Sequence, residues 1–130
     1  TATYSKIGGT AVAVSGSGPL GTIDSATLGV AFGAAPKVGL DLAITVGGTR
    51  YTMASSGGAA APSVGLDTAT MTFGSDASVV GGTCTATTCF GGFNGFLAGV
   101  GATHAGLSFD IPLGPNRGAE SANGVVALAR

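Results

Sequence analysis

The feature that most constrains the fold is an unbroken alternation of residue types from Val38 to Val46. Every second position is a branched apolar residue, and the positions between them hold Gly, Asp, Ala and Thr. A strand sends successive side chains to opposite faces, whereas a helix would place Asp41 beside apolar neighbours. Gly47 and Gly48 follow at once, and then a second alternating run over Thr49–Ala54. Since both glycines can take positive φ, the pattern predicts a tight hairpin between two strands.

The same alternation recurs along the chain, with Gly-rich or Pro-containing turns between the runs, and no segment shows helical periodicity over ten residues. We therefore expect an all-β fold, a small antiparallel barrel of about eight strands, with a two-sheet β-sandwich as the alternative. The other expected strands are Tyr4–Ser15 (one or two), Thr27–Phe32, Thr68–Phe73, Ala77–Gly81, Phe90–Leu97, His104–Ile111 and Val125–Ala129.

The organisation expected from this pattern is a single domain over residues 1–130, with a flexible or partner-paired N-terminal segment, residues 1–17. Exposed loops are expected over Gly57–Pro62 and Gly114–Asn123. Glycines also stand inside the strand patterns, where they permit sharp coiling and close approach of another backbone. Examples are Gly29, Gly39, Gly92 and Gly106.

The two cysteines lie close together in Cys84-Thr-Ala-Thr-Thr-Cys89. Their spacing differs from that of thioredoxin-like redox motifs. Two thiols alone are a poor zinc site, because a structural zinc ion is bound by four ligands. The simplest interpretation is a disulfide that clamps a short hairpin loop, and this implies an oxidising compartment.

Charge is unusually scarce: 8% of residues are charged, with a net charge of −1, and the chain has 25 glycines and no tryptophan. Without clustered Lys and Arg we expect no nucleic-acid binding. The apolar runs are all too short for a membrane-spanning helix. The chain starts at Thr1 without a leader, so we expect a processed product or a fragment, and the surface chemistry favours an extracellular or cell-surface protein.

Catalytic chemistry is poorly represented, and we expect no enzyme, no metal site and no cofactor. His104 is the only histidine, and it lies on the opposite strand face from Leu107 and Phe109, so we expect it to be exposed. A haem-ligand role is the sharper alternative, for which the candidates are His104, Met53, Met71, Tyr4 and Tyr51. The carboxylates are isolated in the sequence, which argues against paired-acid hydrolysis and calcium loops. They are Asp24, Asp41, Asp67, Asp76, Asp110 and Glu120.

Three phenylalanines recur every third residue, at Phe90, Phe93 and Phe96. On a strand this spacing puts Phe90 and Phe96 on one face and Phe93 on the other. At least one is then expected on the outside, where an apolar stripe would suit self-association.

The stretch from Phe93 to Phe109, followed by Gly124–Ala129, resembles the final hairpin of the transferrin-binding-protein-type β-barrel. In that family a Gly-Phe-Phe strand leads through a Gly-rich turn to a strand that opens with Ala-Gly or Gly-Gly. The whole chain also resembles the C-terminal barrel of some proteobacterial proteins with FecR-type domains, in the opening Tyr4–Gly9, the run Thr22–Leu28 and the cysteine pair before the last hairpin. The resemblance implies an eight-stranded, exported, non-catalytic barrel. Relatives include surface proteins that bind host proteins or haem, but none of their binding residues can be matched to this chain.

Two functions are therefore expected. The first is an extracellular structural protein, a self-associating surface or filament subunit that adds residues 1–17 to a neighbour's sheet edge. The second is a binding module of a surface, uptake or signalling protein, which captures haem, an iron carrier or a partner protein at the barrel mouth.

Overall fold

The computed structural model describes residues 1–15, 21–116 and 119–130. These residues form ten β-strands and no helix. The strands are β1 (Ala2–Gly9), β2 (Ala13–Val14), β3 (Thr22–Ala31), β4 (Lys37–Val46), β5 (Thr49–Ala54), β6 (Val64–Gly65), β7 (Thr72–Val80), β8 (Phe90–Ala98), β9 (His104–Pro112) and β10 (Ser121–Ala129). The part of the chain that the structure describes therefore contains no helix able to cross a membrane.

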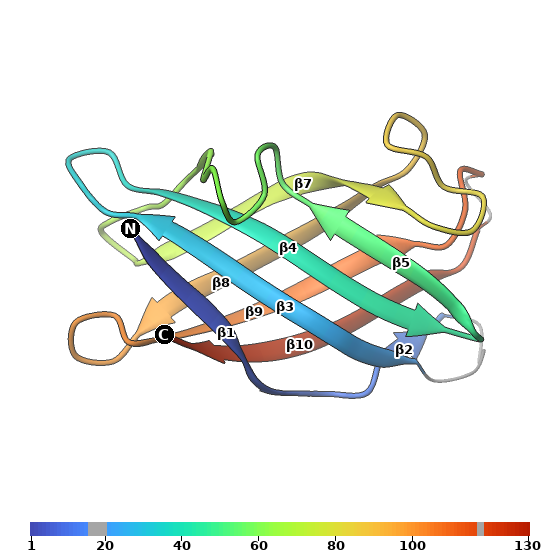
Figure 1. Cartoon of the computed structure of the whole chain (residues 1–130), viewed down its shortest axis with the longest axis horizontal. Coiled ribbons are helices and arrows are strands. Elements are labelled where there is room, and N and C mark those ends of the chain that lie inside the picture. Colours follow the sequence, from blue (N-terminus) through green and yellow to red (C-terminus); the bar gives the residue numbers. More distant parts are fainter. Residues whose placement is uncertain (16–20, 117–118) are drawn as a thin grey trace.

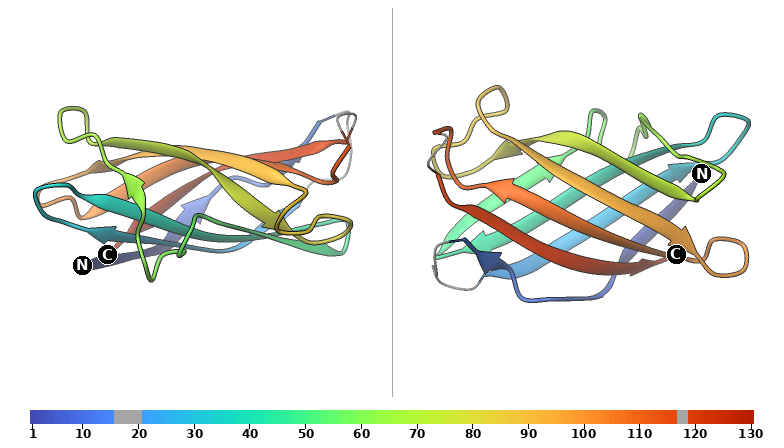
Figure 2. Two further views of the ribbon diagram at one scale, coloured as in Figure 1. Left: turned by 90° about the horizontal axis from the view of Figure 1, so that it is seen from above. Right: turned by 180° about the vertical axis from the view of Figure 1, so that it is seen from behind.

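Eight of the strands close into one antiparallel barrel in the order β1-β3-β4-β5-β7-β8-β9-β10, and β10 pairs back onto β1. The short strands β2 and β6 are additions that pair with β10 and β4. The layer of β1, β3, β4 and β5 lies in front of β8, β9 and β10, and the two chain ends lie at the same end of the barrel (Figures 1 and 2). The expected barrel is confirmed, and the sandwich alternative is not what forms.

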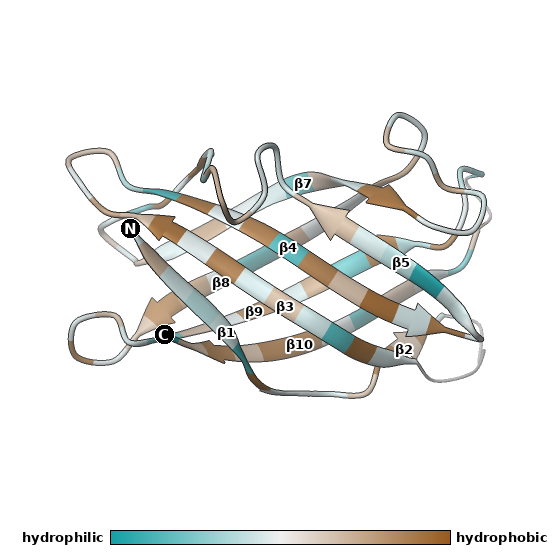
Figure 3. Ribbon diagram, viewed as in Figure 1, coloured by the Kyte–Doolittle hydropathy of each residue, from teal (hydrophilic) through white to brown (hydrophobic). Residues whose placement is uncertain are grey.

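The interior of the barrel is filled by apolar side chains from every strand, because alternate residues point inward. Along the strands, hydrophobic and hydrophilic positions follow one another (Figure 3). The largest side chains that are completely buried are Tyr4, Leu28, Leu40, Ile44, Met53, Ile111 and Leu128. Because these side chains occupy the interior, the outer wall and the barrel ends are the surfaces where another molecule can bind.

The predicted hairpin at Gly47 and Gly48 is confirmed. Strand β4 ends at Val46 and β5 begins at Thr49, and the two glycines have φ of 57° and 81°. Both values lie in the left-handed region that L-residues other than glycine rarely adopt, as a two-residue turn of this hand requires.

The structure has one strand, β7, where two were predicted: it contains Ala77–Val80 as expected, but the prediction of a strand over residues 68–71 and of a break before Ala77 is wrong. Residues 68–71 form a tight turn in which the Asp67 carboxylate accepts a hydrogen bond from Ala69 N at 2.9 Å. The amide of Asp67 donates to Thr72 O at 2.8 Å and closes this turn. The strand then runs unbroken through Gly74 and Asp76, which face outward and are exposed, so their polarity does not interrupt it.

The last strand is also longer than expected and the loop before it is shorter. We expected a loop over Gly114–Asn123, but β10 begins at Ser121. Ser121 pairs with Pro112 and Ala122 with Ile111. These small and polar residues have weak strand propensity, and it is the pairing with β9 that makes them extended.

The expected exposed loop Gly57–Pro62 lies against the outer wall of the barrel. Gly29 and Gly39 face each other across β3 and β4. A Cβ at Gly29 would stand 1.9 Å from Ala59 O, and one at Gly39 would stand 2.0 Å from Gly58 O. The close backbone approach expected at these two glycines is thus confirmed, and it buries Gly58 within a loop that is otherwise largely exposed.

The N-terminal segment is part of its own barrel. Strand β1 pairs with β3 on one edge and with β10 on the other. In this arrangement β1 has no free edge, so donating residues 1–17 to a neighbour would require the barrel to open. Residues 16 and 17 lie outside the described part of the chain.

Candidate functional site

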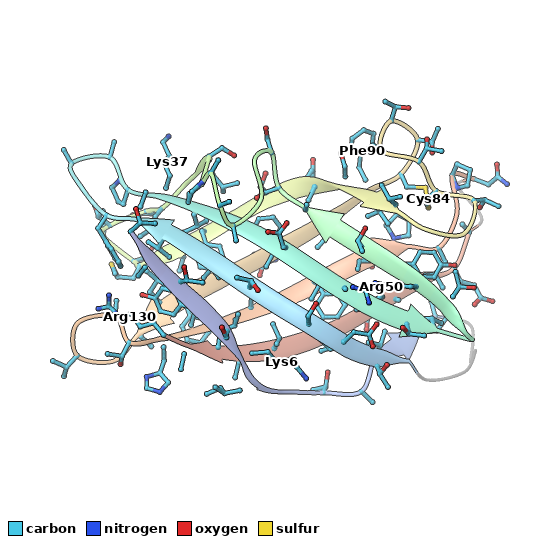
Figure 4. The ribbon with its side chains drawn as sticks, viewed as in Figure 1. Lys6, Lys37, Arg50, Cys84, Phe90 and Arg130 are labelled. Carbon is cyan, nitrogen blue, oxygen red and sulfur yellow. A yellow bond between two sulfur atoms is a disulfide. The ribbon has the colours of Figure 1, made fainter. Side chains whose placement is uncertain are left out.

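The predicted disulfide is present between Cys84 and Cys89, with a Cα–Cα distance of 5.4 Å. It clamps the loop that joins β7 to β8, and Figure 4 shows it near Phe90 at the opposite end of the barrel from Arg130. Both cysteines are buried, and the amide of Val79 donates to Cys89 O at 3.0 Å. The bridge therefore anchors a loop to the barrel.

The five haem-ligand candidates are not brought together. His104 begins β9 on the outer face and is exposed, as expected, with Nδ1 2.9 Å from Thr103 Oγ1. Tyr4 and Met53 are fully buried in the core, and Tyr51 is 8% exposed. Met71 lines a surface pocket at one barrel end, whereas Met53 borders a different pocket on the outer face of β4 and β5.

Like Asp67 in the turn before β7, Asp24 and Asp41 serve local structure. Asp24 accepts hydrogen bonds from Thr22 Oγ1 at 3.1 Å and Thr45 Oγ1 at 2.6 Å. Asp41 accepts from the amide of Ala59 at 2.9 Å and so ties the docked loop to the wall. Within residues 1–15, 21–116 and 119–130, no three His, Cys, Asp or Glu side chains gather closely enough to hold a metal ion.

Asp76 and Asp110, by contrast, are not isolated. The register pairs Asp76 with Gly92 on β8, and Gly92 with Asp110 on β9. The two exposed carboxylates therefore flank a glycine on one row of the outer wall, with Cα atoms about 10 Å apart over two interstrand spacings. They are 34 positions apart in the sequence, so only the strand register could reveal this pair.

Two adjoining grooves run over the outer face of β7, β8, β9 and β10, and we call them together the outer trough. The acidic groove, of about 670 Å³, contains Asp76 and Asp110. The apolar groove, of about 640 Å³, lies between Phe96 and Val125. Asn94 and Ser108 line both grooves, and Ser108 Oγ donates to Asn94 Oδ1 at 3.2 Å.

Outward-facing glycines hollow out this wall. Nothing lies closer than 3.9 Å to a Cβ built at Gly92, which leaves open space between the two aspartates. At Gly106 the ring of Phe96 covers the backbone, with a ring carbon 2.8 Å from the position of a Cβ. The ring is nevertheless 51% exposed, and Val125 is 52% exposed. As predicted from their spacing, Phe90 and Phe96 lie on one face and Phe93 on the other, and the structure shows that the face of Phe90 and Phe96 is the outer one.

A third pocket, of about 650 Å³, lies at the barrel end that carries the chain termini. The guanidinium carbon of Arg130 lies 5.7 Å from the ring centre of Phe32 and 6.0 Å from that of Tyr4. Tyr4 donates its hydroxyl to Ala102 O. Burial raises the pKa of Tyr4, and the positive charge of Arg130 opposes this rise in part. The remaining lining residues are Met71, Leu97, Ala98, Gly99 and Gly101.

Comparisons of the chain with protein-family models, with curated proteins and with solved structures gave no match. The outer trough and the end pocket therefore stand as candidate sites on their geometry alone.

Proposed function

We propose that this chain is a non-catalytic structural protein of the cell exterior, which self-associates through the outer trough. The proposal rests on one observation. Apolar side chains fill the interior of the barrel, whereas the outer wall has a groove beside which Phe96 and Val125 are both more than half exposed. Apolar side chains gathered around a groove mark an interaction surface, because association removes them from water.

The scarcity of charge supports the same function. With 8% charged residues and a net charge of −1, two copies of this chain repel each other weakly. Among the described residues, most of the exposed ones are Gly, Ala, Ser and Thr, which lose little side-chain entropy on packing. The disulfide is compatible with an oxidising, exported location, and an eight-stranded barrel is compatible with the transferrin-binding-protein-type resemblance.

Sedimentation velocity on the native chain, from about 10 µM to about 1 mM, tests the proposal, because this concentration range covers the weak association expected for a contact through one groove. Larger species should grow with concentration, and negative-stain electron microscopy should show their form. Phe96→Ser should weaken association about tenfold or more, as loss of a central aromatic anchor does. Val100→Ser is the matched control, since Val100 is an apolar residue 97% exposed on a loop at the barrel end. A chain that stays monomeric at the highest concentration would overturn the proposal.

The end pocket favours a second candidate, a binding module for an apolar ligand that carries an acidic group, the class to which haem belongs. One cation, Arg130, stands beside Phe32 and Met71. Saturable haem binding, one per chain and weakened by Arg130→Ala, would support this function. His104→Ala tests the ligand role of the histidine: an unchanged haem spectrum would remove it.

A further inference from the structure

The outer face of β1 carries a feature that complements the outer trough. Lys6 pairs with Leu128 of β10, but the next pair is Gly8 with Ala127, so Ile7 is an extra residue in a β-bulge. A bulge breaks the alternation of side chains and re-aims them. Lys6 and Ile7 are consequently both exposed although they are neighbours, with Ile7 64% exposed. Figure 4 shows Lys6 at the lower edge of the barrel, beside β10.

This pairing of a cation with an exposed apolar neighbour does not recur in the described part of the chain. Lys37 precedes Val38, which is fully buried, and Arg50 precedes Tyr51, which is 8% exposed. Arg130 stacks beside aromatic rings at the barrel end.

The outer trough offers the matching half. Its acidic row holds Asp76 and Asp110, and its aromatic row holds Phe96, four residues further along the strands. At a rise of about 3.3 Å per residue the two rows are about 13 Å apart. A lysine carries its charge on a flexible four-carbon stem. The side chains of Lys6 and Ile7 can therefore diverge, so that Lys6 contacts the acidic row and Ile7 contacts the aromatic row.

Resting on the self-association proposed above, we propose that the bulge of Lys6 and Ile7 on one copy docks in the outer trough of a second copy. The Lys6 ammonium then lies between the carboxylates of Asp76 and Asp110. Ile7 fills the apolar groove between Phe96 and Val125. A second copy is the occupant that the observations favour, because a single chain carries both halves with complementary charge and apolar surface.

The trough spans β7 to β10, and the bulge lies on β1, which is the next strand. One copy thus presents both halves outward, and the contact either closes as a reciprocal pair or propagates as a chain of copies. Sedimentation of the native chain distinguishes a dimer from a polymer.

The decisive experiment mixes two variants that each lack one half. Ile7→Asp removes the apolar side chain that the bulge presents, and Phe96→Asp removes the aromatic wall of the apolar groove. Circular dichroism checks that both variants still fold. Each alone should be monomeric where the native chain associates, and an equimolar mixture should form a heterodimer, because one intact bulge still meets one intact trough. Ile7→Asp that associates like the native chain would overturn the docking but leave self-association standing, as would a mixture that stays monomeric. A native chain that never associates would overturn both.

A charge exchange keeps the proposal testable if either apolar variant unfolds. Lys6→Glu should weaken association about tenfold at low salt, and adding both Asp76→Lys and Asp110→Lys on the same chain should restore it, since both charge pairs are then reversed. Lys37→Glu is the matched control and should leave association unchanged. Equal effects of Lys6→Glu and Lys37→Glu would show a general charge effect and refute the specific contact.

Discussion

Replacing Gly39 by alanine tests whether the loop at residues 55–63 is held against the barrel wall. The added Cβ would stand 2.0 Å from Gly58 O and 3.1 Å from Pro62 Cα. Real Cβ atoms essentially never come within 3.0 Å of such atoms, so the loop must retreat by about 1 Å. The Asp41 carboxylate would then lose the amide of Ala59, which it now accepts at 2.9 Å.

The expected cost follows from three contributions. Overpacking costs about 1–3 kcal/mol, and the lost hydrogen bond costs about 1 kcal/mol. Alanine also lowers the conformational entropy of the unfolded chain, which increases the unfolding free energy by about 0.4–1 kcal/mol. The net loss of unfolding free energy is about 2 kcal/mol, or about 7 °C in Tm for a chain of this length.

Gly65→Ala is the matched control. Gly65 lies in β6 beside the same loop, and nothing lies within 4 Å of a Cβ built there. This variant should be as stable as the native chain or slightly more so. Urea unfolding followed by circular dichroism measures both variants, and hydrogen exchange should show the Ala59 amide exchanging faster in Gly39→Ala. If Gly39→Ala were as stable as Gly65→Ala, the docked loop would be refuted.

Two further perturbations have definite expected results. Replacing Cys84 and Cys89 together by alanine removes the closure of a short loop, which should lower the unfolding free energy by about 2 kcal/mol; an unchanged thermal midpoint would contradict a stabilising bridge. Tyr4→Phe removes the hydroxyl that donates to Ala102 O and should cost about 1–2 kcal/mol in urea unfolding. Burial raises the pKa of Tyr4 in the folded state, so the unfolded chain ionises first. The contribution of Tyr4 is therefore complete below pH of about 10 and is lost as the pH rises further, and Tyr4→Phe should weaken this alkaline decline.

Much of the fold could be predicted from local patterns. The alternation at Val38–Val46 and the two glycines after it specify a hairpin without help from the rest of the chain, because side-chain period and turn conformation are local properties. The disulfide was likewise predictable, since two cysteines five positions apart meet across a short loop. The prediction was wrong where local propensity and tertiary pairing disagree, as in the outward-facing Gly74 and Asp76 of β7 and the small residues that open β10 at Ser121.

The sequence by itself determined the class of the fold, the apolar face of Val38–Val46 and the placement of Phe90 and Phe96 on the face opposite to Phe93. The tertiary structure alone decided the candidate sites. Asp76 and Asp110 become neighbours only through the register of β7, β8 and β9. The bulge at Ile7 exists only because the register between β1 and β10 shifts by one residue after Lys6. Register and closure depend on contacts between residues far apart in the chain, and no local pattern encodes those contacts.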